Sequence, residues 1–102
     1  MTMVYEIKYH KNIVDDLKSL DKSVRDKVFK KLEQLKKNLN LGHPLGNKAG
    51  MDLTGFYKLY VDNRRVRIVY KPDNTMLCLF IIAIGQREDL EIYRTAWQRK
   101  NI

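Results

Sequence analysis

The segment YVDNRRVRIVYK, residues 60–71, carries Arg65 and Arg67 at alternate positions of a run that otherwise resembles a β-strand. Arginine inside a strand is costly unless it is solvated, paired or facing a ligand. Guanidinium groups hold phosphates and aromatic rings stack on bases, so cations interleaved with aromatics suit single-stranded RNA. Cross-strand packing of arginine on aromatic rings explains the pattern equally well. The choice depends on the elements that position these residues.

Three apolar segments are expected to form strands around these arginines. They are FYKLYV at residues 56–61, RVRIVYK at 65–71 and MLCLFIIAI at 76–84. Short polar connections between them favour antiparallel hairpins. A two-residue turn at 63–64 would pair Tyr60 with Arg67 and Lys58 with Val69. On the other face it would pair apolar and aromatic residues, which belong against helices: Val61 with Val66, Leu59 with Ile68, and Tyr57 with Tyr70.

A second two-residue turn, at 73–74, would place Phe80 opposite Arg67. Arg67 is then expected between Tyr60 and Phe80 on the face away from the N-terminal helices, with Lys58 nearby. A register slip of one residue would move Arg67 into the core, so this expectation depends on the turns.

The N-terminal part predicts a strand and two helices. VYEIKYH at residues 4–10 alternates as a strand does. Residues 11–20 and 22–39 carry apolar residues at helical spacing, and Asp21 is a candidate cap between them. The expected buried positions are Ile13, Val14, Leu17, Leu20, Val24, Val28, Leu32, Leu35 and Leu39. The lysines on the other faces of the second helix are available to phosphates or simply solvated.

The remaining segments are expected to be a loop and a C-terminal helix. Residues 40–55 contain Pro44 and several glycines and indicate a loop. Neither His10 nor His43 has other ligand types at metal-binding spacing, so no metal site or cofactor is expected. Gly85 ends the last strand, and a helix is expected to begin near residues 88–89, with Leu90, Tyr93 and Trp97 on one stripe.

Length and charge restrict the function further. A chain of 102 residues is expected to form a single domain, residues 1–102. The formal net charge of +8 favours a polyanionic partner, although a solvated basic surface has the same composition. One cysteine excludes an internal disulfide, and the longest apolar run, at 76–84, is too short to span a bilayer. A cytoplasmic protein without membrane contact is expected.

Taken together, the strand–helix–helix start, the YKL…RVRIVY hairpin and the segment IGQREDLEIY resemble the RelE toxins of the RelE/ParE superfamily. The resemblance covers essentially the whole chain, and GQREDLEIY, residues 85–93, is its most specific piece. It implies an α+β fold: a small, antiparallel-rich sheet of about four strands, two N-terminal helices on one face and a short C-terminal helix.

The resemblance also implies a type II toxin–antitoxin system, in which a cognate antitoxin neutralises an endoribonuclease that cleaves mRNA in the ribosomal A site. The family's active-site residues correspond here to Lys58, Arg67, Arg87 and Tyr93. A second family lysine is replaced by Tyr60.

RNA cleavage by its own 2′-hydroxyl requires proton removal, charge stabilisation at phosphorus and protonation of the leaving oxygen. Arginines supply the charge, and Tyr93 is the candidate base, although an ordinary tyrosine pKa of about 10 is high for neutral pH. Tyr60, Arg65 and Phe80 are the candidate RNA-binding residues. Two alternatives remain open: a ParE-like gyrase inhibitor on the same fold, and an inactive basic module that binds only RNA or antitoxin.

Overall fold

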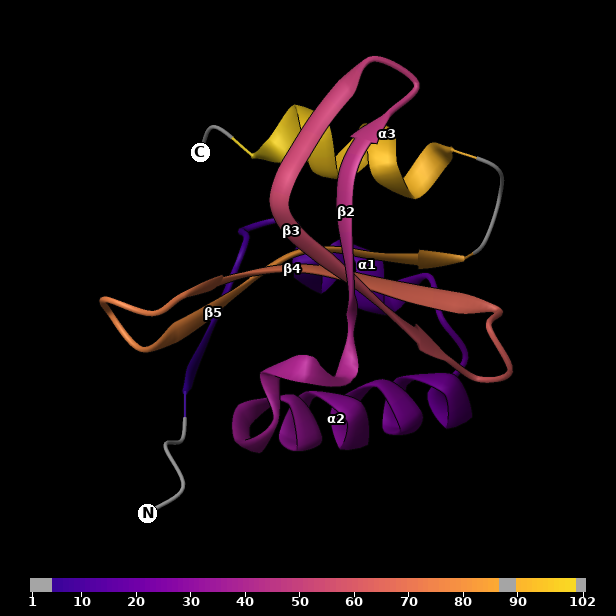
Figure 1. Cartoon of the computed structure of the whole chain (residues 1–102). Coiled ribbons are helices and arrows are strands. Elements are labelled where there is room, and N and C mark those ends of the chain that lie inside the picture. The colour runs from indigo at the N-terminus through magenta and orange to yellow at the C-terminus, as the bar shows by residue number, and fades with distance from the viewer. Residues whose placement is uncertain (1–4, 87–89, 101–102) are drawn as a thin grey trace.

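In a computed structural model, which describes residues 5–86 and 90–100, a five-stranded sheet separates two helical layers (Figure 1). The strand order is β1-β5-β4-β3-β2; β1 runs parallel to β5, and the other neighbours are antiparallel. The strands are β1 (Glu6–Tyr9), β2 (His43–Lys48), β3 (Met51–Val61), β4 (Val66–Asp73) and β5 (Cys78–Gln86). The helices are α1 (Ile13–Lys18), α2 (Lys22–Lys37), the 3₁₀ helix η1 (Leu39–Leu41) and α3 (Glu91–Arg99). This confirms the predicted α+β fold, with five strands rather than about four.

Helices α1 and α2 cover one face of the sheet because their apolar stripes pack on β3, β4 and β5. Val28, Leu32 and Leu35 of α2 are buried at the predicted spacing. Asp21 occupies the N-cap position of α2, as predicted, but its side chain makes no capping hydrogen bond. Val14 was expected on the buried stripe of α1, yet its side chain is exposed. The expectation for Val14 is wrong because α1 contains only six residues and turns Ile13 alone fully into the core.

Helix α3 lies on the opposite face and covers a second, smaller core (Figure 1). Its buried residues are Ile92, Tyr93 and Ala96, which pack against apolar residues of β3, β4 and β5. Trp97 was predicted to share the stripe of Tyr93, but it is 43% exposed. The buried face of α3 is therefore rotated about its axis by about one residue relative to the predicted face. The expected helix start at residues 88–89 lies outside the described residues.

The β3–β4 hairpin has the predicted register throughout, from Tyr57 opposite Tyr70 to Val61 opposite Val66. Asn63 and Arg64 lie at the centre of a turn that the Arg65 N–H closes by donating to the carbonyl oxygen of Asp62 at 3.0 Å. Asp62, Asn63 and Arg64 all have positive φ angles, of 56°, 53° and 68°. These strands thus place Tyr60 directly opposite Arg67.

The predicted β4–β5 register is wrong: Arg67 lies opposite Gly85, and Phe80 lies opposite Lys71. Two local features cause the difference. The Asp73 carboxylate accepts hydrogen bonds from the backbone N–H groups of the two residues that follow Asn74, which widens the turn to four residues. A bulge in β5 then adds one further residue between the two strands.

Residues 40–55, predicted as a loop, contain η1, β2 and the first part of β3. Strand β2 lies at the edge of the sheet, where a proline such as Pro44 does not interrupt a ladder. Ala49 and Gly50 close the β2–β3 hairpin, both with positive φ. His43 lies in this strand and is exposed.

Candidate active site

Arg67 occupies the middle of the sheet, on the face that α3 covers, and only 6% of its surface is exposed. Its guanidinium carbon lies 5.4 Å from the centre of the Tyr60 ring and 5.0 Å from the centre of the Tyr93 ring. Its Nε atom is buried and has no hydrogen-bond partner among the described residues. On β5 it faces Gly85, where an added Cβ would come within 3.0 Å of Ile92. The missing side chain at Gly85 thus lets α3 approach the sheet beside Arg67.

Lysine side chains approach the same two rings from β2 and β3. The Lys58 ammonium lies 5.2 Å from the centre of the Tyr60 ring and 6.0 Å from that of Tyr93. Lys58 and Tyr60 share a face because alternate residues of a strand point the same way. Lys48 lies 5.7 Å from the Tyr93 ring, and Arg64 lies 5.5 Å from the Tyr60 ring. We call this group the cation–tyrosine cluster: Lys48, Lys58, Tyr60, Arg64, Arg67 and Tyr93.

The structure therefore brings together four of the residues singled out in the sequence, Lys58, Tyr60, Arg67 and Tyr93. It does not place Phe80 in the cluster, because Phe80 faces Lys71 on β4 and packs at the border of the smaller core. Arg65 is exposed beside the β3–β4 turn. Arg87 lies outside the described residues.

Two members of the cluster, Lys48 and Arg64, were not recognised in the sequence. Lys48 was missed because residues 40–55 were interpreted as a loop. The available signal was Ala49-Gly50, since a two-residue connection ending in glycine can join two strands tightly. Arg64 was assigned to the turn alone, and a positive φ at this position directs it toward Tyr60.

The cluster offers positive charge and phenol groups within a partly closed site. Arg67 and Tyr93 are nearly buried, whereas Lys58 and Tyr60 are half-buried and form the accessible rim. Each cation lies near the face of an aromatic ring, an arrangement that stabilises cations with little water around them. In the described part of the chain, no group of three or more histidine, cysteine or carboxylate side chains could hold a metal ion. The chemistry available here is electrostatic stabilisation of an anion beside a phenol.

Comparisons with known proteins agree with this architecture. A family model described as the ParE toxin of the type II toxin–antitoxin system parDE matches residues 7–91. The chain belongs to this toxin family. The toxin is 25% identical over 97 residues to the mRNA interferase toxin RelE of Escherichia coli strain K12, a match covering 95% of this chain and 98% of that protein. The mRNA interferase RelE of Shigella flexneri matches to the same extent. These relatives confirm the resemblance to RelE toxins.

Solved structures show the same fold. The free form of an E. coli RelE mutant superimposes with a TM-score of 0.74 at 24% identity, covering 95% of this toxin and 98% of that chain. RelE in the RelE–RelB complex from Pyrococcus horikoshii superimposes with a TM-score of 0.66 at 20% identity, covering 85% and 99%. Among the described residues, no helix is both long enough and apolar enough to cross a membrane.

Proposed function

We propose that this toxin is an endoribonuclease that cleaves translated mRNA in the ribosomal A site. The observation that carries the proposal is the position of the Arg67 guanidinium between the rings of Tyr60 and Tyr93, with the Lys58 ammonium close to both rings. A phosphodiester undergoing attack gains negative charge, and fixed cations stabilise that charge best in a site with little water. Relatives in E. coli and S. flexneri named mRNA interferases support the same class of reaction.

In the proposed reaction, the 2′-oxygen of the RNA attacks the adjacent phosphorus and the bond from phosphorus to the 5′-oxygen breaks. The products are a 2′,3′-cyclic phosphate and a free 5′-hydroxyl. In this proposal Tyr93 acts as its phenolate, receives the proton of the 2′-hydroxyl and becomes a neutral phenol, and the Lys58 ammonium is the accessible proton donor for the leaving oxygen. Arg67 stabilises the charge on phosphorus, and Arg87 is proposed to assist it.

The burial of Arg67 and Tyr93 restricts how a long RNA can approach. We propose that the phosphate enters at the rim formed by Lys58 and Tyr60, with Arg65 holding the backbone further out and Phe80 available to a neighbouring base. Among the described residues, the cation–tyrosine cluster includes no histidine or carboxylate to tune proton transfer, so correct placement of the RNA must supply much of the acceleration. Positioning alone can be worth several kcal/mol, which explains a requirement for the ribosome.

An antitoxin is the second proposed partner, and the cytoplasm the proposed place of action. Solved relatives include RelE in complex with RelB from P. horikoshii and in the intact E. coli RelBE complex. The net charge of +8 on this toxin favours an acidic partner. A cognate antitoxin is therefore expected to bind the toxin and suppress RNA cleavage.

A gyrase-directed activity is the alternative, since the matching family model describes ParE toxins. Induced expression of the toxin separates the two functions. Translation arrest with cuts in A-site codons, mapped by primer extension, supports the nuclease. DNA-damage signalling without such cuts supports gyrase inhibition, and absence of toxicity supports a binding module that lacks activity.

The residues of the site are tested in the same assay. Tyr93→Phe and Arg87→Ala are expected to lower A-site cutting strongly while the protein still folds. Tyr9→Phe is the matched control, because Tyr9 is 50% exposed on β1 and stands outside the cluster. Undiminished cutting by Tyr93→Phe would remove the phenol from the proton transfer and leave it a packing role.

A further inference from the structure

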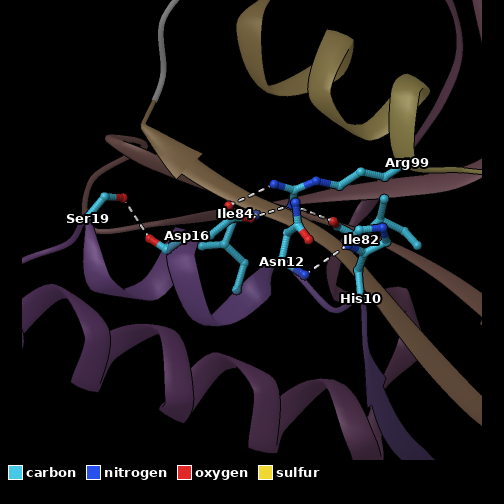
Figure 2. Close-up of polar contacts among 7 residues, drawn as sticks. All are labelled: His10, Asn12, Asp16, Ser19, Ile82, Ile84 and Arg99. Atoms are coloured by element: carbon cyan, nitrogen blue, oxygen red, sulfur yellow. Dashed lines mark hydrogen bonds and ion pairs between the residues drawn. The ribbon is translucent and has the colours of Figure 1, made fainter. Parts of the chain in front are cut away.

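The edge of β5 carries an ion pair that ties α1 to α3 (Figure 2). Strand β1 stops at Tyr9, opposite Ile81, so within the described part of the chain the rest of β5 has no neighbouring strand on that side. The bulge in β5 also leaves Ile82 without a paired residue on β4. Two charged side chains, Asp16 of α1 and Arg99 of α3, lie along this unpaired edge and form hydrogen bonds with two of its backbone groups.

The contacts are specific. Arg99 Nη1 and Nη2 donate to the two carboxylate oxygens of Asp16 at 2.8 and 3.0 Å, a two-pronged geometry that fixes both side chains. Arg99 Nη1 also donates to the carbonyl oxygen of Ile82 at 3.0 Å, and the N–H of Ile84 donates to Asp16 at 3.0 Å. Both charged side chains are only 14% exposed. Such pairing differs from the ion pair between Glu91 and Arg94 on the same helix, which is exposed and has a single contact of 3.4 Å.

The ion pair between Asp16 and Arg99 affects the position of Tyr93, because Arg99 and Tyr93 both belong to α3. The helix has nine residues, too few to be stable without tertiary contacts. Arg99 lies six residues beyond Tyr93, about 9 Å along the helix axis. A sliding or rotation of α3 that moves Tyr93 away from Arg67 must therefore break the two-pronged pair with Asp16.

We propose that Asp16 and Arg99 are positioning residues, which hold α3 in the register that keeps Tyr93 against Arg67 during RNA cleavage. The role rests on the nuclease function proposed above. Apolar packing of Ile92 and Ala96 keeps α3 on the sheet, and the ion pair sets where along the sheet the helix rests. A small displacement of a reacting group can cost about 100-fold in rate, so a loose α3 lowers the rate of cleavage at saturation more than it lowers binding.

The chain provides a spectroscopic reporter, since its single tryptophan, Trp97, lies on α3 and is part-exposed. The test compares Asp16→Asn, Arg99→Gln and Arg99→Lys with the wild type in two measurements. One is the fluorescence anisotropy of Trp97. The other is the single-turnover cleavage of mRNA on programmed ribosomes, with the saturated rate and the half-saturating concentration determined separately. Arg94→Gln is the matched control, because it removes an exposed arginine from the same helix.

Asp16→Asn and Arg99→Gln are expected to lower the saturated rate about 10- to 100-fold, to change the half-saturating concentration by less than about threefold, and to lower the anisotropy. Asp16→Asn with Arg99→Gln in one chain should be no slower than the slower single variant, because both changes break the same contact. Arg99→Lys keeps the positive charge but loses one of the two hydrogen bonds to Asp16, so its saturated rate should lie between that of the wild type and that of Arg99→Gln. It also provides a folded variant if Arg99→Gln does not fold.

Assays are run well below the lowest melting temperature of the set, so that loss of global stability alone does not change the rate. Variants that cleave at the wild-type rate, or that keep the wild-type anisotropy of Trp97, would overturn the positioning role while leaving the nuclease function intact. A wild-type toxin that cuts no mRNA would instead overturn the proposed function, and this role with it.

Discussion

Removal of a single oxygen from Tyr70 is expected to cost the fold about a fifth of the stability typical of a domain of this size, on the order of 2 kcal/mol. The Tyr70 side chain is fully buried, and its ring stacks on Tyr57 with centres 5.6 Å apart. Its hydroxyl donates to the carbonyl oxygen of Leu39 at 3.1 Å and accepts from the N–H of Gly42 at 3.1 Å. It thereby fastens the segment between α2 and β2 to the centre of the sheet.

In Tyr70→Phe, the ring and its stack remain, but two part-buried backbone groups lose their partner. Each unpaired group costs about 1 kcal/mol at the lower end of the usual range, which gives a total near 2 kcal/mol. For a domain of this size, the melting temperature should fall by roughly 8–16 °C. Urea unfolding followed by circular dichroism measures the free energy directly. Tyr57→Phe is the control, because no hydrogen bond of its hydroxyl is found among the described residues, and it should cost less than about 0.5 kcal/mol.

The same hydroxyl predicts a dependence on pH. Burial raises the pKa of Tyr70 to about 12, from an ordinary value of 10.0. Because the folded protein holds this proton more tightly than the unfolded chain, the contribution is complete below pH 10 and is lost as the pH rises toward 12. The stability difference between the wild type and Tyr70→Phe should therefore narrow across that interval. A Tyr70→Phe protein as stable as Tyr57→Phe at neutral pH would refute the reasoning.

Three further outcomes follow from local geometry. Gly42→Ala should destabilise the fold by about 1–3 kcal/mol, because the new Cβ would overlap the Tyr70 hydroxyl, and Tyr70→Phe in the same chain should recover part of the loss in urea unfolding. Leu77→Gly should raise the melting temperature slightly, because the φ of 53° costs leucine about 1–2 kcal/mol. The greater flexibility of glycine in the unfolded chain offsets only part of this stabilisation. A lower melting temperature of the variant would contradict the expectation. Burial, reinforced by the charge of Arg99, lowers the pKa of His10 from 6.5. The contribution of His10 to stability is therefore complete above pH 6.5 and is lost as the pH falls below that value. His10→Gln should lose less stability between pH 7 and pH 5 than the wild type does.

The first hairpin could be predicted from the sequence because its information is local. Asn63 tolerates the positive φ that it has in the turn, and the flanking residues alternate apolar and polar in a pattern that only one register satisfies. Since that register places Tyr60 opposite Arg67, half of the cluster followed directly from residues 57–70. Lys58 came with it, as the next residue on the same face of the strand.

Most of the rest of the site depends on features with no clear local signal. The β4–β5 register depends on a widened turn held by the Asp73 carboxylate and on a bulge at Ile82, and each shifts the pairing without changing the apolar pattern of β5. Because both faces of β5 are buried, alternation could not select its register. Lys48 had one local signal, the Ala49-Gly50 turn that follows it, whereas the position of α3 depends on long-range packing, which propensities do not encode.

Burial of Arg67 answers the question raised by its place in a strand. Its neighbours on β4 are apolar or aromatic and fully buried, so an apolar residue at position 67 would fit the core at lower cost. The arginine instead keeps a buried Nε atom without a described partner, and it exchanges water for the faces of two tyrosine rings. Groups that work against local stability concentrate at functional sites, where the rest of the fold holds them in place. The cross-strand pairing with Tyr60 and the approach of Tyr93 from α3 thus explain how this cation is tolerated. The nuclease function that we propose would supply the reason for a cation at this position, namely stabilisation of an RNA phosphate.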